Sequence, residues 1–202
     1  MDLMTEPIKR LLITGFDPFG GETVNPSWEA VRLLPEAVGA YRLTKLQIPT
    51  VFGQAAEKVL SAAAEQKPDR ILCIGQAGGR SAVTPEVVAI NLREAKIPDN
   101  AGNQPVNVPV VENAPAAYFS TVPVRAMVKA MQNVGLPAAL SYSAGTFVCN
   151  DVLYTLLHFF DGTQTQVGFV HVPFLPEQAK GNAPSLPLMQ IVQALTAAIE
   201  RC

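Results

Sequence analysis

Charged residues are scarce in this sequence. Asp, Glu, Lys and Arg make up 16% of its 202 residues, and the net charge is -2. The Lys and Arg residues are scattered, whereas a nucleic-acid-binding protein concentrates them in a patch or stripe. Hydrophobic residues make up 49% of the chain, far more than is typical of a disordered protein. The composition therefore predicts a globular protein that binds no nucleic acid.

Long apolar runs are also missing. No segment approaches the roughly 18 apolar residues of a membrane span. Residues 1–7 are acidic in character, and the apolar run that follows, 11–13, is short. A signal peptide would need a basic start and a longer apolar stretch. We therefore expect a cytoplasmic protein with no membrane partner.

Cysteine and histidine are few. The chain has three cysteines, an odd number with no C-x-x-C spacing, and two histidines. Disulfide-stabilised domains use paired cysteines, and a structural zinc ion needs four ligands at characteristic spacings. The sequence therefore predicts neither a disulfide framework nor a structural zinc site.

What the sequence does contain is an alternation of short apolar segments and helical patterns. Strands are predicted at residues 10–14, 41–48, 70–75, 87–92, 138–142 and 167–172. Helices are predicted from Pro26, with Asn25 as the N-cap, and at residues 54–66, 124–133, 148–160 and 186–201. Strands that alternate with helices pair in parallel through right-handed crossovers. We predict a single domain over residues 1–202, an α/β fold built as a three-layer α/β/α sandwich with a mostly parallel twisted sheet.

The loops at the carboxyl ends of these strands are the expected ligand site, because open parallel sheets bind ligands there. Two of them, 15–21 and 75–80, are rich in glycine, but neither has the order of a Walker loop or a G-x-G-x-x-G turn. Their glycines instead allow tight turns and a close approach of the backbone to a small ligand. Phe16 and Phe19 in the first loop either cover the core or form apolar walls for a flat, uncharged ring.

Cys149 is the candidate nucleophile. It opens the predicted helix 148–160, where unpaired N–H groups and the helix dipole favour a thiolate and can hold an oxyanion. This position is also compatible with a packed cysteine at a helix start. Cys73 lies inside an apolar strand and is predicted to be structural. Cys202 is the last residue, and we predict that it is mobile and catalytically idle.

His171 is the candidate base. It lies at the end of the predicted strand 167–172, at the sheet edge from which Cys149 emerges. His158 is on the same predicted helix as Cys149 but roughly 13 Å further along and on the opposite side, so it cannot reach the thiol. A third group should orient the His171 imidazole through its other nitrogen. The spacing does not choose between Glu86, Asp17, Asp99 and Asp151.

Six segments, taken in order, resemble the type I pyroglutamyl peptidases. They are Gly15-Phe-Asp-Pro-Phe-Gly-Gly, Ile74-Gly-Gln-Ala-Gly-Gly-Arg80, Pro85-Glu86 with Ala89-Ile-Asn91, Ile97-Pro-Asp-Asn100, Ala144-Gly-Thr-Phe-Val-Cys-Asn150 and His171-Val-Pro-Phe-Leu-Pro-Glu177. The match runs from about Leu11 to Gln178, which is most of the chain. Each motif alone is modest, but six in this order are highly specific.

The resemblance implies a cysteine exopeptidase that removes N-terminal pyroglutamate from peptides through a thioester acyl-enzyme. It implies Cys149 as nucleophile, His171 as base and Glu86 as the carboxylate that orients His171. It also implies that no metal or cofactor takes part and that the protein is a homotetramer. The substrate-binding residues implied by the resemblance are Phe16 and Phe19 around the lactam ring, with Gln76, Phe147 and Val148 close by.

The chain departs from the family pattern at two positions. Lys96 stands where the family has Arg, and Val87 where it commonly has a polar residue. Neither belongs to the implied triad, but Lys cannot make the planar, bidentate contact of Arg. Two other functions remain compatible with the sequence: a non-catalytic α/β domain that binds a cyclic small molecule, and a different cysteine amidase on a similar fold.

Overall fold

The computed structural model describes residues 8–202 of the chain. Residues 1–7, the acidic start that argues against a signal peptide, lie outside the described residues. None of the helices in the described range combines the length with the apolar character that crossing a bilayer requires.

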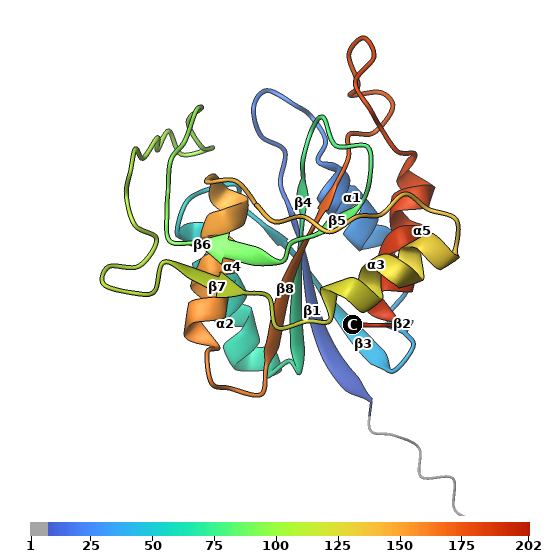
Figure 1. Ribbon diagram of the computed structural model, residues 1–202, viewed down its shortest axis with the longest axis horizontal. Helices are drawn as coiled ribbons and strands as arrows, with labels where there is room; N and C mark the ends of the chain where they lie inside the picture. Colours follow the sequence, from blue (N-terminus) through green and yellow to red (C-terminus); the bar gives the residue numbers. More distant parts are fainter. Residues whose placement is uncertain (1–7) are drawn as a thin grey trace, which may run out of the picture.

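A mostly parallel sheet forms the centre of the fold (Figure 1). Its parallel strands are β1 (Lys9–Phe16), β3 (Tyr41–Ile48), β4 (Arg70–Gln76) and β8 (Gln166–Val172). Two short strands, β2 (Ala37–Val38) and β5 (Thr84–Pro85), pair antiparallel at its edges. Within the described residues, the strand order is β2-β3-β1-β4-β8-β5. This arrangement confirms the predicted fold class.

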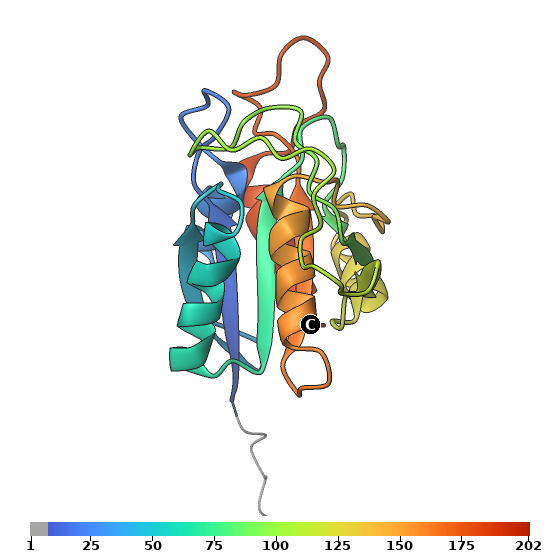
Figure 2. The same cartoon turned by 90° about the vertical axis from the view of Figure 1, so that its left-hand side faces the viewer.

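Helices cover both faces of the sheet. One face carries α2 (Gln54–Gln66) and α4 (Val148–Phe159), and the other carries α1 (Pro26–Leu33), α3 (Val124–Asn133) and α5 (Leu188–Ile199). Figure 2, turned by a right angle, looks onto α2 and α4 packed side by side. Asn25 caps α1 as predicted, because its Oδ1 accepts a hydrogen bond from the Ser27 N–H at 3.1 Å.

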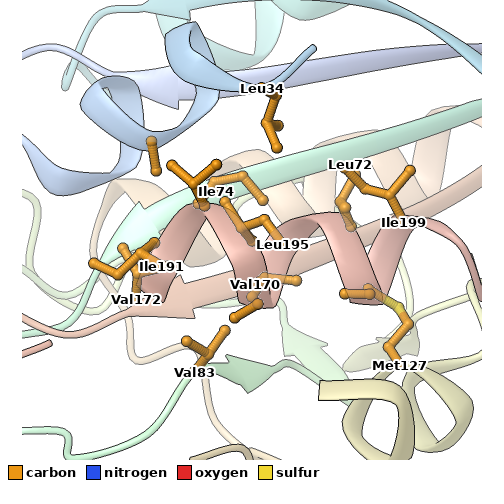
Figure 3. Close-up of a cluster of buried hydrophobic side chains, with 14 of the residues drawn as sticks. Leu34, Leu72, Ile74, Val83, Met127, Val170, Val172, Ile191, Leu195 and Ile199 are labelled. Carbon is orange, nitrogen blue, oxygen red and sulfur yellow. The ribbon is translucent and has the colours of Figure 1, made fainter. Parts of the chain in front are cut away.

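The core is divided between the two faces because successive strand residues point in opposite directions. In β4, Leu72 and Ile74 pack on the α5 side, whereas Ile71 and Cys73 pack on the α4 side. Figure 3 shows the first cluster, in which α5 lies across β4 and β8. The side chains labelled there are Leu34, Leu72, Ile74, Val83, Met127, Val170, Val172, Ile191, Leu195 and Ile199.

Two predicted strands do not join the sheet as expected. Segment 87–92 contributes only β6 (Val88–Ile90), which pairs antiparallel with β7 (Ala117–Phe119) in a separate sheet. Segment 138–142 forms no continuous strand and makes single bridges to Val83 and Glu86. The physical reason for the interruption is Pro85, which lies between those two residues and has no N–H for the ladder.

The loops that follow β1, β4 and β8 all rise from one edge of the sheet, where α4 also begins (Figure 1). Parallel strands bring their carboxyl ends to a common edge, so segments distant in sequence meet there. The candidate site residues of the sequence cluster at this edge.

Replacing Gly15 by Ala is expected to destabilise the fold. Near the end of β1, α1 begins so close that a Cβ on Gly15 would lie 2.6 Å from the Cα and N atoms of Trp28. Backbone atoms cannot rotate away, so the elements must shift, at a cost of about 3 kcal/mol in free energy of unfolding. Urea denaturation of variant and wild type measures the difference. A loss below about 0.5 kcal/mol, as for surface substitutions, would contradict this packing.

Candidate active site

Cys149 lies in the first turn of α4, at the carboxyl edge of the sheet. The N-cap residue, Phe147, makes no side-chain cap, so the first N–H groups of the helix are not occupied by a capping side chain. The sulfur lies directly over Gly75 of β4, where an added Cβ would be 3.0 Å from Sγ. Gly75 is paired in register with His171 of β8. The missing side chain at position 75 therefore makes room for the thiol beside the histidine strand.

His171 and Glu86 form a buried pair. Nδ1 of His171 lies 2.7 Å from Oε1 of Glu86. His171 is 3% exposed and Glu86 is 0% exposed. Because Nδ1 is held by the carboxylate, Nε2 is the ring nitrogen left for the cavity that His171 lines together with Cys149. Among the four acids that the sequence left open, Glu86 is the one that contacts His171.

The other three acids hold a loop instead. Each accepts a hydrogen bond from a backbone N–H of loop 50–53, which connects β3 to α2. The pairs are Asp17 with Thr50 at 2.7 Å, Asp99 with Phe52 at 2.9 Å, and Asp151 with Gly53 at 2.8 Å. Charge-assisted bonds to backbone N–H groups are stronger than neutral ones, so this loop is firmly positioned. These acids position structure around the site and do not orient the imidazole.

A cavity of about 330 Å³ opens beside Cys149 and His171. Phe16, Phe19 and Phe147 contribute its apolar walls. The rings of Phe19 and Phe147 lie 6.1 Å apart between centroids. The polar lining residues are Asn25, Thr50, Gln76, Arg80 and Ser143. An apolar pocket with a few polar groups is typical of small-ligand sites.

Gln76 is held by a second amide. Gln178 is 7% exposed, and its Oε1 accepts a hydrogen bond from the Leu175 N–H at 3.1 Å. Its Nε2 donates to the Val24 carbonyl oxygen and to Oε1 of Gln76, both at 3.3 Å. Because the oxygen of Gln76 is engaged in this way, its NH₂ group is the part available to a ligand in the cavity.

Val148 differs from the other residues implied by the resemblance. Its side chain is fully buried in the α4-side core and does not line the cavity. A contact with a ligand from this position would have to come from its backbone N–H. Lys96 is exposed and Val87 is half-buried, and neither lines the cavity. The two departures from the family pattern therefore lie outside the pocket wall.

The electrostatics of the site oppose the thiolate predicted from the helix start. Burial raises the pKa of the Cys149 thiol to about 12, and the nearby charge of Glu86 adds to the rise. Burial also lowers the pKa of His171, although the hydrogen bond and charge of Glu86 act against this. The effect of desolvation on the thiol pKa is larger than the opposing effect of the N–H groups and dipole at the helix start. Both pKa shifts favour a neutral thiol beside a neutral imidazole. These directions run against the thiolate that the helix start alone predicts.

Arg80 is a site residue that sequence reasoning missed. Its Nη1 lies 2.7 Å from the same Oε1 of Glu86 that contacts His171. Burial favours the protonated form of Glu86, but contacts to His171 and the charge of Arg80 outweigh it and lower the pKa of the carboxyl. The sequence does offer a signal for Arg80, because this charged residue ends a glycine-rich loop that follows a strand. A charge in such a place is expected to pair with a buried residue of opposite charge.

The remaining cysteines and histidine do not line the cavity. Cys73 is fully buried in β4. The prediction of a mobile Cys202 is wrong, because this residue is 8% exposed and its carbonyl oxygen accepts a hydrogen bond from the Tyr41 hydroxyl at 2.9 Å. His158 lies near the far end of α4, where Nδ1 is 2.9 Å from the Tyr118 hydroxyl. Residues 8–202 contain no cluster of three His, Cys, Asp or Glu residues that could bind a metal.

Known proteins share both the sequence and the fold. The family description of pyroglutamyl peptidases matches residues 9–202. The pyrrolidone-carboxylate peptidase of Levilactobacillus brevis is 53% identical over 194 residues, which cover 94% of this chain and 95% of that protein. That of Enterococcus faecalis is 51% identical, covering 95% of this chain and 92% of its own length.

Solved structures agree with the sequence relatives. Pyroglutamyl peptidase I of Bacillus amyloliquefaciens superimposes with a TM-score of 0.92 at 49% identity, covering 96% of each chain. The pyrrolidone carboxyl peptidase of Thermococcus litoralis has a TM-score of 0.90 at 36% identity, covering 95% of this chain and 92% of that one. Identity of this extent over nearly the whole length establishes common descent and not only a shared fold. The chain therefore belongs to the pyroglutamyl peptidase family.

Proposed function

We propose that this chain is a cysteine exopeptidase that removes N-terminal pyroglutamate from peptides. The observation that carries the proposal is that Cys149 and a Glu86-bound His171 line one aromatic cavity in a member of this family. A nucleophile, a base and an orienting carboxylate in this order form the arrangement that acyl transfer requires.

The first half of the reaction forms a thioester. Nε2 of His171 takes the thiol proton while Sγ of Cys149 bonds to the pyroglutamyl carbonyl carbon. The oxygen becomes an oxyanion, which the uncapped N–H groups at the start of α4 stabilise. When the intermediate collapses, the C–N bond breaks and the imidazolium gives its proton to the leaving amine.

The second half releases the product. His171 accepts a proton from water, and the resulting hydroxide attacks the thioester carbon. The C–S bond then breaks, the thiolate recovers a proton from the imidazolium, and free pyroglutamate leaves. Glu86 holds Nδ1 throughout, so that Nε2 keeps its direction and the imidazolium is stabilised each time it forms.

The cavity suits a lactam better than a free amino terminus. Pyroglutamate carries no ammonium group, so its ring needs apolar walls and a few amide partners. Phe16, Phe19 and Phe147 provide such walls, and the NH₂ group of Gln76 is available to the lactam carbonyl. A substrate that lacked the lactam amide would leave this polar group unpaired, which makes the pocket selective.

We further infer that residues 1–202 act as one catalytic domain in a cytoplasmic homotetramer. One central sheet carries both Cys73-bearing β4 and His171-bearing β8, which supports a single unit. In the described residues all three cysteines are free, as is usual in a reducing compartment. Phe119 and Phe159 are 71% and 62% exposed, and assembly would cover apolar side chains of this kind. Light scattering on the purified protein measures the assembly.

Two alternatives remain separable by experiment. A non-catalytic binding domain predicts that a pyroglutamyl chromogenic substrate is bound but not hydrolysed. A different cysteine amidase predicts faster turnover of prolyl or glutaminyl substrates than of the pyroglutamyl one. Family membership and the aromatic cavity favour the pyroglutamyl peptidase over both.

Removing the nucleophile or the base is expected to abolish turnover. Cys149→Ser and His171→Ala should each lower kcat/KM on a pyroglutamyl chromogenic substrate by about 1000-fold or more. The matched controls Cys73→Ala and His158→Ala lie outside the cavity and should retain activity. Full activity in Cys149→Ser would contradict the proposed mechanism.

The acid side of the pH profile should report His171. Protonated imidazole cannot accept the thiol proton, and burial lowers the pKa of this group below its ordinary value of 6.5. Activity should therefore persist as the pH falls through 6.5 and decline only below it. The measurement is kcat/KM from pH 4 to 9, and a midpoint above 6.5 would contradict the neutral buried base.

Gly75→Ala tests the position of the thiol. The added methyl group would lie 2.7 Å from Cζ of Phe169 and 3.0 Å from Sγ of Cys149, so the ring and the sulfur must both shift. We expect kcat/KM to fall by about 100-fold, because small displacements of reacting groups have effects of this size. Thermal unfolding shows whether the variant is folded. A folded variant with wild-type kcat/KM would show that the sulfur does not react from this position.

A further inference from the structure

Arg80 connects three parts of the chain that surround the catalytic pair. Its Nη1 donates to Oε1 of Glu86 at 2.7 Å and also to the hydroxyl of Thr84. Its Nη2 donates to the carbonyl oxygen of Ser143 at 3.0 Å. Arg80 follows β4, Thr84 lies in β5, and Ser143 begins the loop that leads to Cys149. One guanidinium thus fixes the Glu86 segment relative to the nucleophile loop.

The geometry at Glu86 is more specific than a general ion pair. Oε1 accepts from both Arg80 and His171, each at 2.7 Å, while the buried Oε2 has no hydrogen-bond partner among the described residues. Two donors on one oxygen divide its charge between them. The imidazole therefore faces a carboxylate whose charge is partly neutralised by the guanidinium of Arg80.

The surroundings of His171 contain few other charges. In the described part of the chain, Glu86 and Arg80 are the charged groups that act on it, and the neutral thiol of Cys149 lines the same cavity. The ring of Phe169 packs against the imidazole at 4.8 Å between centroids. Glu86 raises the pKa of His171 and Arg80 lowers it, on top of the larger effect of burial.

We propose that Arg80 is a positioning residue for the base: by sharing Oε1 of Glu86 with His171, it keeps the imidazole oriented and in its neutral, proton-accepting form. This inference rests on the proposed function, in which His171 takes the proton of Cys149. Without Arg80, the full charge of Glu86 would act on His171 and would stabilise the imidazolium more strongly. His171 would then already be protonated at pH values where it now accepts a proton. Arg80 acts through Glu86 and need not touch the reacting atoms.

Direct titration of the imidazole provides the test. The chain has only two histidines, so ¹⁵N-histidine NMR gives two titrating rings, and a His158→Gln variant assigns them. In Arg80→Met, the titration midpoint of His171 is expected to rise by about one pH unit. The acid limb of kcat/KM should rise by a similar amount. Arg80→Lys restores a positive charge and should return both midpoints toward the wild-type values.

Arg93→Met is the matched control. Arg93 also pairs with a fully buried carboxylate, Asp151 at 2.6 Å, and its side chain is 23% exposed compared with 27% for Arg80. This pair does not contact His171, so the His171 midpoint should stay at the wild-type value. If Arg80→Met does not fold, Arg80→Gln, which removes the charge but keeps a hydrogen-bond donor, should show the same upward shift.

The outcomes separate the two proposals. A His171 midpoint in the folded, neutral Arg80 variant that equals the wild-type value overturns the role of Arg80, even if activity falls. A midpoint that rises equally in Arg93→Met also overturns it, because the effect would then be general. A wild-type protein that does not hydrolyse the pyroglutamyl substrate overturns the proposed function, while the NMR midpoint still decides whether Arg80 controls the protonation of His171.

Discussion

The hydrogen bond between Glu86 and His171 is the constraint on which the candidate site depends. Both side chains are buried, and an uncompensated carboxylate there would be costly. The fold must therefore bring the segment after β5 against the end of β8, and it does so through the antiparallel pairing of these two strands. With Nδ1 held by this contact, Nε2 is the ring nitrogen left for the cavity beside α4, which His171 lines.

Backbone contacts position the other parts of the site around Glu86 and His171, at the carboxyl edge of the sheet. Gly75 lets the thiol sit over β4, beside the strand that carries His171. Three carboxylates hold the 50–53 loop through its N–H groups, and that loop places Phe52 edge-on against Phe147, with 5.3 Å between ring centroids. Polar contacts to the 50–53 loop therefore hold Phe52 against Phe147, which lines the cavity. A site built on loops becomes rigid when a surrounding layer of residues fixes its side chains in this way.

Much of the fold could be predicted from the sequence because its elements are strongly periodic. The segments 41–48, 54–66 and 124–133 have the predicted bounds, since local pattern and propensity agree there. The segments 87–92 and 138–142 are less predictable. An apolar run such as 138–142 looks like a strand, but whether it joins a continuous ladder depends on Pro85 in a distant segment.

The site likewise combines features of local sequence pattern with contacts between distant segments. Cys149 and His171 were recognisable because each stands at the end of a regular element, whereas the acid that contacts His171 could not be chosen by spacing. The helix start that favours a thiolate at Cys149 is visible in the sequence, whereas the burial that raises the pKa of this thiol is not. A raised thiol pKa lowers the fraction of thiolate, which is the form that reacts with peroxides and disulfides. The burial that accompanies the position of Cys149 beside the cavity therefore also lowers the reactivity of this thiol toward oxidants.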